Sequence, residues 1–139
     1  MKKKLVYLNS ISQTTMKEVW EDEERKLSPW IKEHLQELSE LIGVPFGNNV
    51  ETERRVGRYE ADIVVSTEGS EEETDLIVIE NQFGKSDHCH LGKSLAYMTN
   101  LGAKTLIWIS DSFTDEHKNA FDSLNRMTNT EYSFYAITL

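Results

Sequence analysis

The apolar positions of this chain follow two spacings, one typical of helices and one typical of buried strands. Apolar residues recur at helical intervals over residues 27–42, which predicts a helix that Gly43 and Pro45 end. Residues 75–81, which contain the continuous apolar run Leu-Ile-Val-Ile, and residues 105–109 are predicted to form central strands that are covered on both faces. The pattern therefore indicates a sheet packed between helices.

Two further helices are expected in the second half of the chain. Ser86 or Asp87 caps one that runs to about residue 100, and Thr114 caps one that continues to Met127. The other expected elements are a short strand or ordered tail at 5–9, a polar helix at 15–26, extended segments at 49–56 and 58–66, a turn at 67–70 and a closing strand at 132–139.

The order of the main elements is helix, three strands, helix, strand, helix, strand. The first three strands form a meander, and the fourth follows a crossover helix and so runs parallel to its neighbour. We expect one compact α/β domain with a mixed central sheet, in which residues 27–139 form the body and residues 1–26 an N-terminal extension.

Composition narrows the class of protein. The chain has 139 residues, 28% charged and 38% hydrophobic, and no apolar run approaches the roughly 20 residues of a membrane helix. The apolar stretch after the N-terminal lysines is too short for a signal peptide. A single cysteine, Cys89, excludes an internal disulfide. We expect a cytoplasmic protein that does not insert into membranes.

The formal net charge of −9 weighs against strong non-specific binding of nucleic acid. Ten of the 24 acidic residues lie in two segments, 18–24 and 68–75. Basic residues lie instead on either side of the candidate site described next; they are Arg54, Arg55, Arg58, Lys85 and Lys93.

The strongest chemical signal is a pair of acids on neighbouring strands. Alternate side chains of a strand share a face, so Glu80 and Gln82 point the same way, and the hairpin places Asp62 beside Glu80. Two carboxylates this close repel unless a cation lies between them, and Mg²⁺ prefers such ligands. The Asn81 carbonyl completes the protein ligands. Because such an ion activates water and neutralises phosphoryl charge, the pattern predicts a metal-dependent nuclease.

A structural interpretation stays open for the same residues. A buried acid needs a partner, and Glu80 has Arg55 or Arg58 within reach as a salt-bridge partner. Gln82, for its part, would then only hydrogen-bond the sheet.

Residues 57–63 (GRYEADI) and 79–82 (IENQ) resemble the signature of the PD-(D/E)XK nuclease superfamily, and the element order matches its core. The resemblance covers roughly residues 27–139 and implies a restriction endonuclease-like fold. A closer likeness is to a little-characterised bacterial and archaeal group of that superfamily. The matching segments are 29–31 (PWI), 56–57 (VG), 79–82 (IENQ), 87–92 (DHCHLG), Tyr97, 108–109 (WI), 116–117 (EH) and 124–125 (LN).

The chain departs from the superfamily at Gln82, where a lysine is usual. A lysine orients the attacking water and stabilises developing charge, whereas glutamine offers hydrogen bonds alone. Lys93 lies four residues before Tyr97 and so on the same helix face, where related exonuclease-type members carry a glutamine and a tyrosine. We expect Gln82 to position water and Lys93, or Lys85, to handle phosphate.

Three more residues are candidates for the site. The superfamily often carries a metal-binding glutamate early in its first helix, and Glu33 is the match, although a solvated helix-face charge explains it as well. His88 and His90 are expected to orient the helix start or to touch phosphate, together with Arg58 and Tyr97. A zinc site is disfavoured because neighbouring histidines on a helix diverge and no paired cysteines accompany them.

The favoured function is therefore Mg²⁺- or Mn²⁺-dependent hydrolysis of nucleic acid. The resemblance implies DNA as the substrate and a role in defence or DNA processing. Asp62, Glu80, Gln82 and Lys93 form the candidate catalytic set. The alternative is a catalytically silent adaptor with a nuclease-like fold, or a domain that works with a separate specificity subunit. A homodimer is also expected, since duplex cleavage benefits from two sites.

Overall fold

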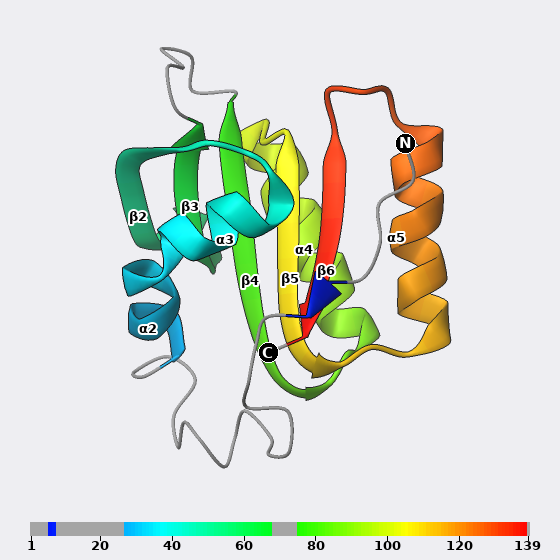
Figure 1. Ribbon diagram of the computed structural model, residues 1–139. Helices are drawn as coiled ribbons and strands as arrows, with labels where there is room; N and C mark the ends of the chain where they lie inside the picture. The colour runs from blue at the N-terminus through cyan, green and yellow to red at the C-terminus, as the bar shows by residue number, and fades with distance from the viewer. Residues whose placement is uncertain (1–5, 8–26, 68–74, 139) are drawn as a thin grey trace.

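The computed structural model describes residues 6–7, 27–67 and 75–138 (Figure 1). The polar helix expected at 15–26 and most of the turn expected at 67–70 lie outside the described residues. Of the strand expected at 5–9, Val6–Tyr7 is described and forms β1.

The described strands form one mixed sheet in the order β1-β6-β5-β4-β3-β2. An antiparallel meander makes up one half, and parallel strands on either side of β5 make up the other, as the element order predicts. The strands that follow β1 are β2 (Phe46–Val56), β3 (Tyr59–Thr67), β4 (Leu76–Lys85), β5 (Thr105–Ser112) and β6 (Ser133–Thr138).

Helices cover both faces of the sheet (Figure 1). Helices α2 (Ser28–Glu33) and α3 (Leu35–Ile42) pack on one face against the isoleucines of the central strands. Helices α4 (His88–Leu101) and α5 (Asp115–Met127) pack on the other, against Val78, Leu106 and Trp108. Because the central strands alternate between these two cores, both of their faces are apolar.

The single helix predicted over residues 27–42 is wrong: the structure has two short helices that meet at His34. The His34 ring stacks on Trp30, with ring centroids 4.0 Å apart, and its Nδ1 hydrogen-bonds the Trp30 carbonyl oxygen at 2.7 Å. The His34 backbone N–H turns instead to the carbonyl of Ile31. The imidazole thus takes the acceptor that a continuous helix would give to the backbone.

Three predicted strands are too short. Strand β2 begins at Phe46 rather than residue 49, β4 continues past Asn81 to Lys85, and β5 continues past Ile109 to Ser112. The pairing of β4 with β5 shifts register between Gln82 and Lys85. Side chains hold this irregular end together, since the Ser110 hydroxyl donates to the Gly84 carbonyl and the Asp111 carboxylate accepts from the Gly84 N–H.

The caps predicted for the two later helices are confirmed. The Asp87 side chain accepts a hydrogen bond from the His90 N–H, and the Thr114 side chain accepts one from the His117 N–H. Gly102 adopts the left-handed conformation that ends α4. None of the helices in the described part of the chain is long and apolar enough to cross a membrane.

Candidate active site

Strands β3 and β4 separate at the two predicted acids. Their ladder ends at the Ile63–Ile79 pair, beyond which β3 continues beside β2 and β4 beside β5. The Asp62 backbone N–H donates to Glu80 Oε2 at 2.8 Å, and the Asn81 N–H donates to Asp62 Oδ2 at 2.9 Å. Each strand therefore satisfies a backbone donor of the other with a carboxylate, which brings the two acids together.

A cavity of about 350 Å³ lies at this separation. It brings together seven of the predicted site residues from the turn before β3, from both strands and from α4; they are Arg58, Asp62, Glu80, Asn81, His90, Lys93 and Tyr97. Lys93 and Tyr97 both line it, as expected for residues four apart on one helix face. Tyr59 and Glu60 also line the cavity. Both lie in the segment 57–63 that carries the resemblance, but sequence reasoning assigned them no role in the site.

The cavity floor is buried and acidic. Only 4% of Glu80 and 4% of Tyr97 is exposed. Burial, followed by the charges of Glu80 and Asp62, raises the pKa of the Tyr97 phenol to about 12. Tyr97 is consequently a neutral hydrogen-bond donor in this cavity at all ordinary pH values.

The ligand chemistry of the cavity is based on oxygen. Within residues 6–7, 27–67 and 75–138, no three histidine, cysteine or acidic side chains gather as a metal cluster. The cavity itself offers two adjacent carboxylates and the neighbouring backbone of Asn81. These oxygen donors suit a hard cation that keeps several water ligands, as Mg²⁺ does.

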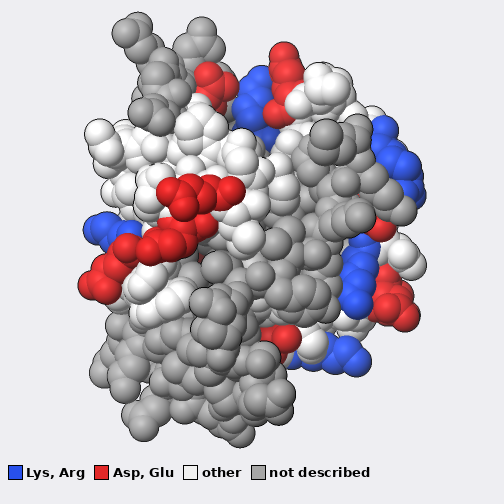
Figure 2. Space-filling view, in the orientation of Figure 1, with Lys and Arg blue, Asp and Glu red and all other residues white. Residues whose placement is uncertain are grey.

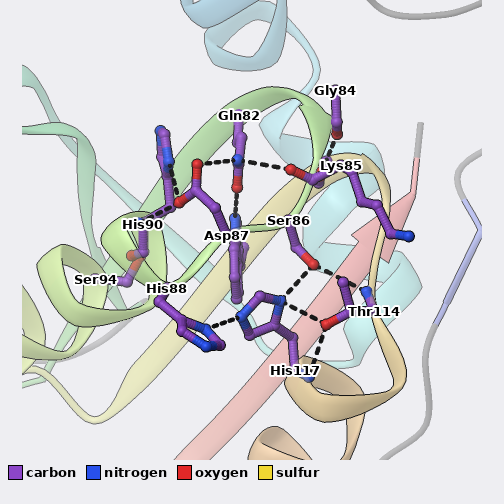
Figure 3. Close-up of polar contacts among 12 residues, drawn as sticks. Gln82, Gly84, Lys85, Ser86, Asp87, His88, His90, Ser94, Thr114 and His117 are labelled. Atoms are coloured by element: carbon purple, nitrogen blue, oxygen red, sulfur yellow. Dashed lines mark hydrogen bonds and ion pairs between the residues drawn. The ribbon is translucent and has the colours of Figure 1, made fainter.

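Gln82 is directed elsewhere (Figure 3). Its Nε2 donates to the Lys85 carbonyl oxygen and to Asp87 Oδ2, each at 2.9 Å, and its Oε1 accepts from Trp108 Nε1 at 3.2 Å. Both amide hydrogens are therefore used, the residue is 3% exposed, and it does not line the cavity. Gln82 ties the start of α4 to the sheet.

Asp87 connects the side chain of Gln82 to His90, which lines the cavity. Its Oδ1 accepts from the His90 backbone N–H at 2.7 Å and lies 2.9 Å from the His90 ring nitrogen Nδ1. Burial acts to raise the pKa of Asp87, but the hydrogen bonds and charge of His90, together with the Gln82 amide, lower it below its usual value. Asp87 is thus an ionised carboxylate that caps the helix and orients His90.

The structure does not bring the remaining predicted residues to the cavity. Glu33 is exposed at the end of α2, and Lys85 is exposed at the end of β4. His88 turns to a different partner, with its Nδ1 2.8 Å from His117 Nε2 (Figure 3).

His117 is a polar centre that sequence reasoning missed. It belongs to α5 and is only 3% exposed. Its Nδ1, however, lies 2.6 Å from the Ser86 hydroxyl and 2.8 Å from the Thr114 hydroxyl. The spacing of Thr114 and His117, a helix cap and the third residue after it, is the signal that was available.

The fold resembles that of a repair endonuclease from Pyrococcus abyssi, with a TM-score of 0.62. The two sequences are 16% identical, and the match covers 86% of this chain and 48% of the other, so this chain spans about half of that protein. No family model and no curated protein matches this sequence. The likeness confirms the predicted mixed α/β, restriction endonuclease-like fold.

Proposed function

We propose that this protein is a metal-dependent nuclease that hydrolyses DNA phosphodiester bonds. The observation that carries the proposal is the pairing of Asp62 with Glu80 at the separation of β3 from β4, inside a cavity that also holds Arg58 and Lys93. Carboxylates can hold a cation that activates water, and side-chain cations can neutralise the charge of a phosphate during its hydrolysis. The endonuclease-like fold supports the same class of reaction.

Asp62 and Glu80, with the carbonyl of Asn81, are the residues that would hold Mg²⁺ or Mn²⁺. These ligands are all oxygen donors, and they would leave coordination positions for water and phosphate oxygens. The ion would neutralise charge on the phosphoryl group during its transfer to water.

The cations of the cavity divide between two elements. Lys93 reaches it from α4, whereas Arg58 comes from the turn between β2 and β3. We assign to Lys93 the charge that Gln82 lacks, and to Arg58 a contact with a neighbouring phosphate. Tyr97 contributes a neutral hydroxyl, which donates a hydrogen bond without adding negative charge.

Exposed acidic side chains disfavour the approach of DNA over α2 and α3. On the opposite face, acidic side chains gather over α2 and α3, where Glu33, Glu37 and Glu40 are exposed (Figure 2). That face repels a phosphate backbone. None of these three acids lines the cavity, which offers Arg58 and Lys93 to a phosphate.

The proposal is tested by incubating labelled single-stranded, double-stranded and branched DNA, and RNA, with the protein and Mg²⁺ or Mn²⁺. We expect cleavage of DNA that requires the metal and is lost in Glu80→Ala. Glu131→Ala is the matched control, because Glu131 pairs with Lys104 and does not line the cavity. Failure to cut any substrate with either metal would contradict the proposal.

Metal binding separates the nuclease from the silent adaptor. Calorimetric titration with Mn²⁺ is expected to show one class of site that Asp62→Asn and Glu80→Ala both weaken. An adaptor has no need to bind metal at these residues. An Mn²⁺ affinity that neither substitution changes would therefore favour the adaptor.

The role of Lys93 has its own test. Lys93→Ala is expected to lower the cleavage rate by about 10-fold or more, since it removes a charge aimed at the phosphate. Lys118→Ala on α5 removes the same charge from outside the cavity and serves as the control. Equal cleavage by Lys93→Ala and the parent would refute the assignment.

A further inference from the structure

We propose that His90, oriented by Asp87, is the general base of this site and accepts the proton of the attacking water at Nε2. This assignment rests on the proposed nuclease function and deepens it. It gives His90 a role other than the phosphate contact expected from sequence, and it moves the activation of water away from Gln82.

Asp87 determines the tautomer of His90. Its Nδ1 lies 2.9 Å from Asp87 Oδ1. An ionised carboxylate only accepts hydrogen bonds, so in the neutral imidazole the proton is on Nδ1 and the lone pair is on Nε2. The same relation of a carboxylate to a histidine prepares the base of serine hydrolases.

Asp87 is itself held in place by hydrogen bonds. Its Oδ2 accepts from Gln82 Nε2, while Gln82 Oε1 accepts from the indole of buried Trp108. A continuous line of hydrogen bonds therefore runs from the core through Gln82 and Asp87 to His90 (Figure 3). The residue that replaces the superfamily's lysine thus supports a histidine at the cavity.

His90 shares the cavity with groups to which other roles are assigned. The titratable and charged side chains that share it are Arg58, Tyr59 and Glu60 from the turn and start of β3, Asp62 from β3, Glu80 from β4, and Lys93 and Tyr97 from α4. Asp62 and Glu80 already accept backbone hydrogen bonds and are the proposed ion ligands. Tyr97 is protonated, and Lys93 is the proposed phosphate contact. Glu60 is exposed and forms an ion pair with Arg55 at 3.9 Å. His90 is the base in the cavity that a second side chain orients.

The step balances with water as the only co-reactant. The water oxygen forms a bond to phosphorus while His90 Nε2 takes one of the water protons. The bond from phosphorus to the leaving sugar oxygen breaks with its electron pair on that oxygen, which takes up a proton from solvent. The imidazolium then releases its proton to solvent, and no oxidation or reduction takes place.

The decisive measurement is the pH dependence of cleavage by His90→Gln and His90→Arg. The backbone N–H of residue 90 still bonds Asp87 in either variant, so the start of α4 is kept, and circular dichroism checks the fold. A general base contributes about 100-fold or more, and its protonation makes the parent lose activity on the acidic side. We expect the cleavage rate of both variants to fall by that factor. We also expect their rate to lose the parent's decline on the acidic side of the pH profile, which is called the acidic limb below.

Two further variants sharpen the test. Asp87→Asn keeps a good helix cap but offers an amide to the histidine, so it is expected to lower kcat with little change in KM or in Mn²⁺ affinity. His88→Gln changes a neighbouring histidine that faces His117, and it is expected to keep the acidic limb of the parent.

Each outcome decides between the assignments. Recovery of activity in His90→Arg would make His90 a phosphate contact and overturn the inference. An acidic limb that persists in His90→Gln would overturn it too, while cleavage by the parent would leave the nuclease standing. A parent that binds Mn²⁺ at Asp62 and Glu80 and yet cuts nothing at any pH would refute the proposed function and this inference together.

Discussion

Asp62 donates its backbone N–H to the carboxylate of Glu80 at 2.8 Å, across the point where β3 and β4 separate. The reverse bond, from the Asn81 N–H to the Asp62 carboxylate, closes the exchange at 2.9 Å. The two acids thus have a structural task and a chemical one in the same place. Substitutions that preserve the first while removing the second can tell them apart.

Glu80→Gln is expected to keep the fold and lose the activity. The amide oxygen still accepts the Asp62 N–H, but the negative charge needed for a cation is gone, and cleavage should fall by about 100-fold or more. Glu80→Leu leaves a donor without its acceptor and should also cost about 1–3 kcal/mol of stability. Cleavage assays with urea unfolding measure both effects, and full activity in Glu80→Gln would contradict the metal role.

Gln82→Lys, which introduces the lysine that is usual in the superfamily this sequence resembles, is expected to lower activity rather than raise it. An ammonium group cannot accept the Trp108 indole N–H, so a buried donor loses its partner at a cost of about 1–3 kcal/mol. The hydrogen bond by which the Gln82 amide holds Asp87 is also disturbed. Thermal unfolding and cleavage rates test this, with Gln82→Glu, which keeps an acceptor for Trp108, as the comparison. Faster cleavage by Gln82→Lys would show that a lysine at position 82 can take part in the reaction.

Tyr97 is expected to make the protein sensitive to alkali. Its pKa is raised from 10.0 to about 12 in the folded state, first by burial and then by Glu80 and Asp62. The contribution to stability is complete below pH 10 and is lost as the pH rises toward 12, because the unfolded chain releases this proton more readily. Tyr97→Phe should therefore lose less stability than the parent as the pH rises from 10 toward 12. Equal alkaline unfolding curves for the two proteins would be evidence against the shift.

His117 is expected to impose the opposite dependence at acidic pH. Burial, and next the charge of His88, lowers the pKa of His117 below 6.5, while Asp87 and Glu116 oppose the shift. Its contribution to stability is complete above pH 6.5 and declines as the pH falls through the lowered pKa, because the unfolded chain binds the proton first. Urea unfolding should show a slope of at most about 1.4 kcal/mol per pH unit from this residue.

The variant His117→Gln tests that dependence. It keeps a polar group beside Ser86 and Thr114 but does not titrate in this range. The variant should be less stable than the parent at neutral pH and should lose part of the slope below pH 6.5. A slope that matches the parent's would assign the acid sensitivity to other groups.

The sequence by itself determined the helices and strands whose formation depends on residues close together in the chain. Helix periodicity, the Asp87 and Thr114 caps and the apolar runs of β4 and β5 are properties of a few consecutive residues, and they predict the mixed sheet. Because a hairpin joins β3 to β4, the meeting of Asp62 with Glu80 followed as well.

Tertiary structure decided the contacts between distant or crowded side chains. The break at His34 depends on whether an imidazole or a backbone N–H reaches the Trp30 carbonyl, which local periodicity does not encode. The partners of Gln82 depend on where Trp108, 26 residues away, packs in the core. A hydrogen-bonding side chain takes the nearest unsatisfied partner that packing leaves within reach, so such roles emerge only once the sheet and α4 are assembled.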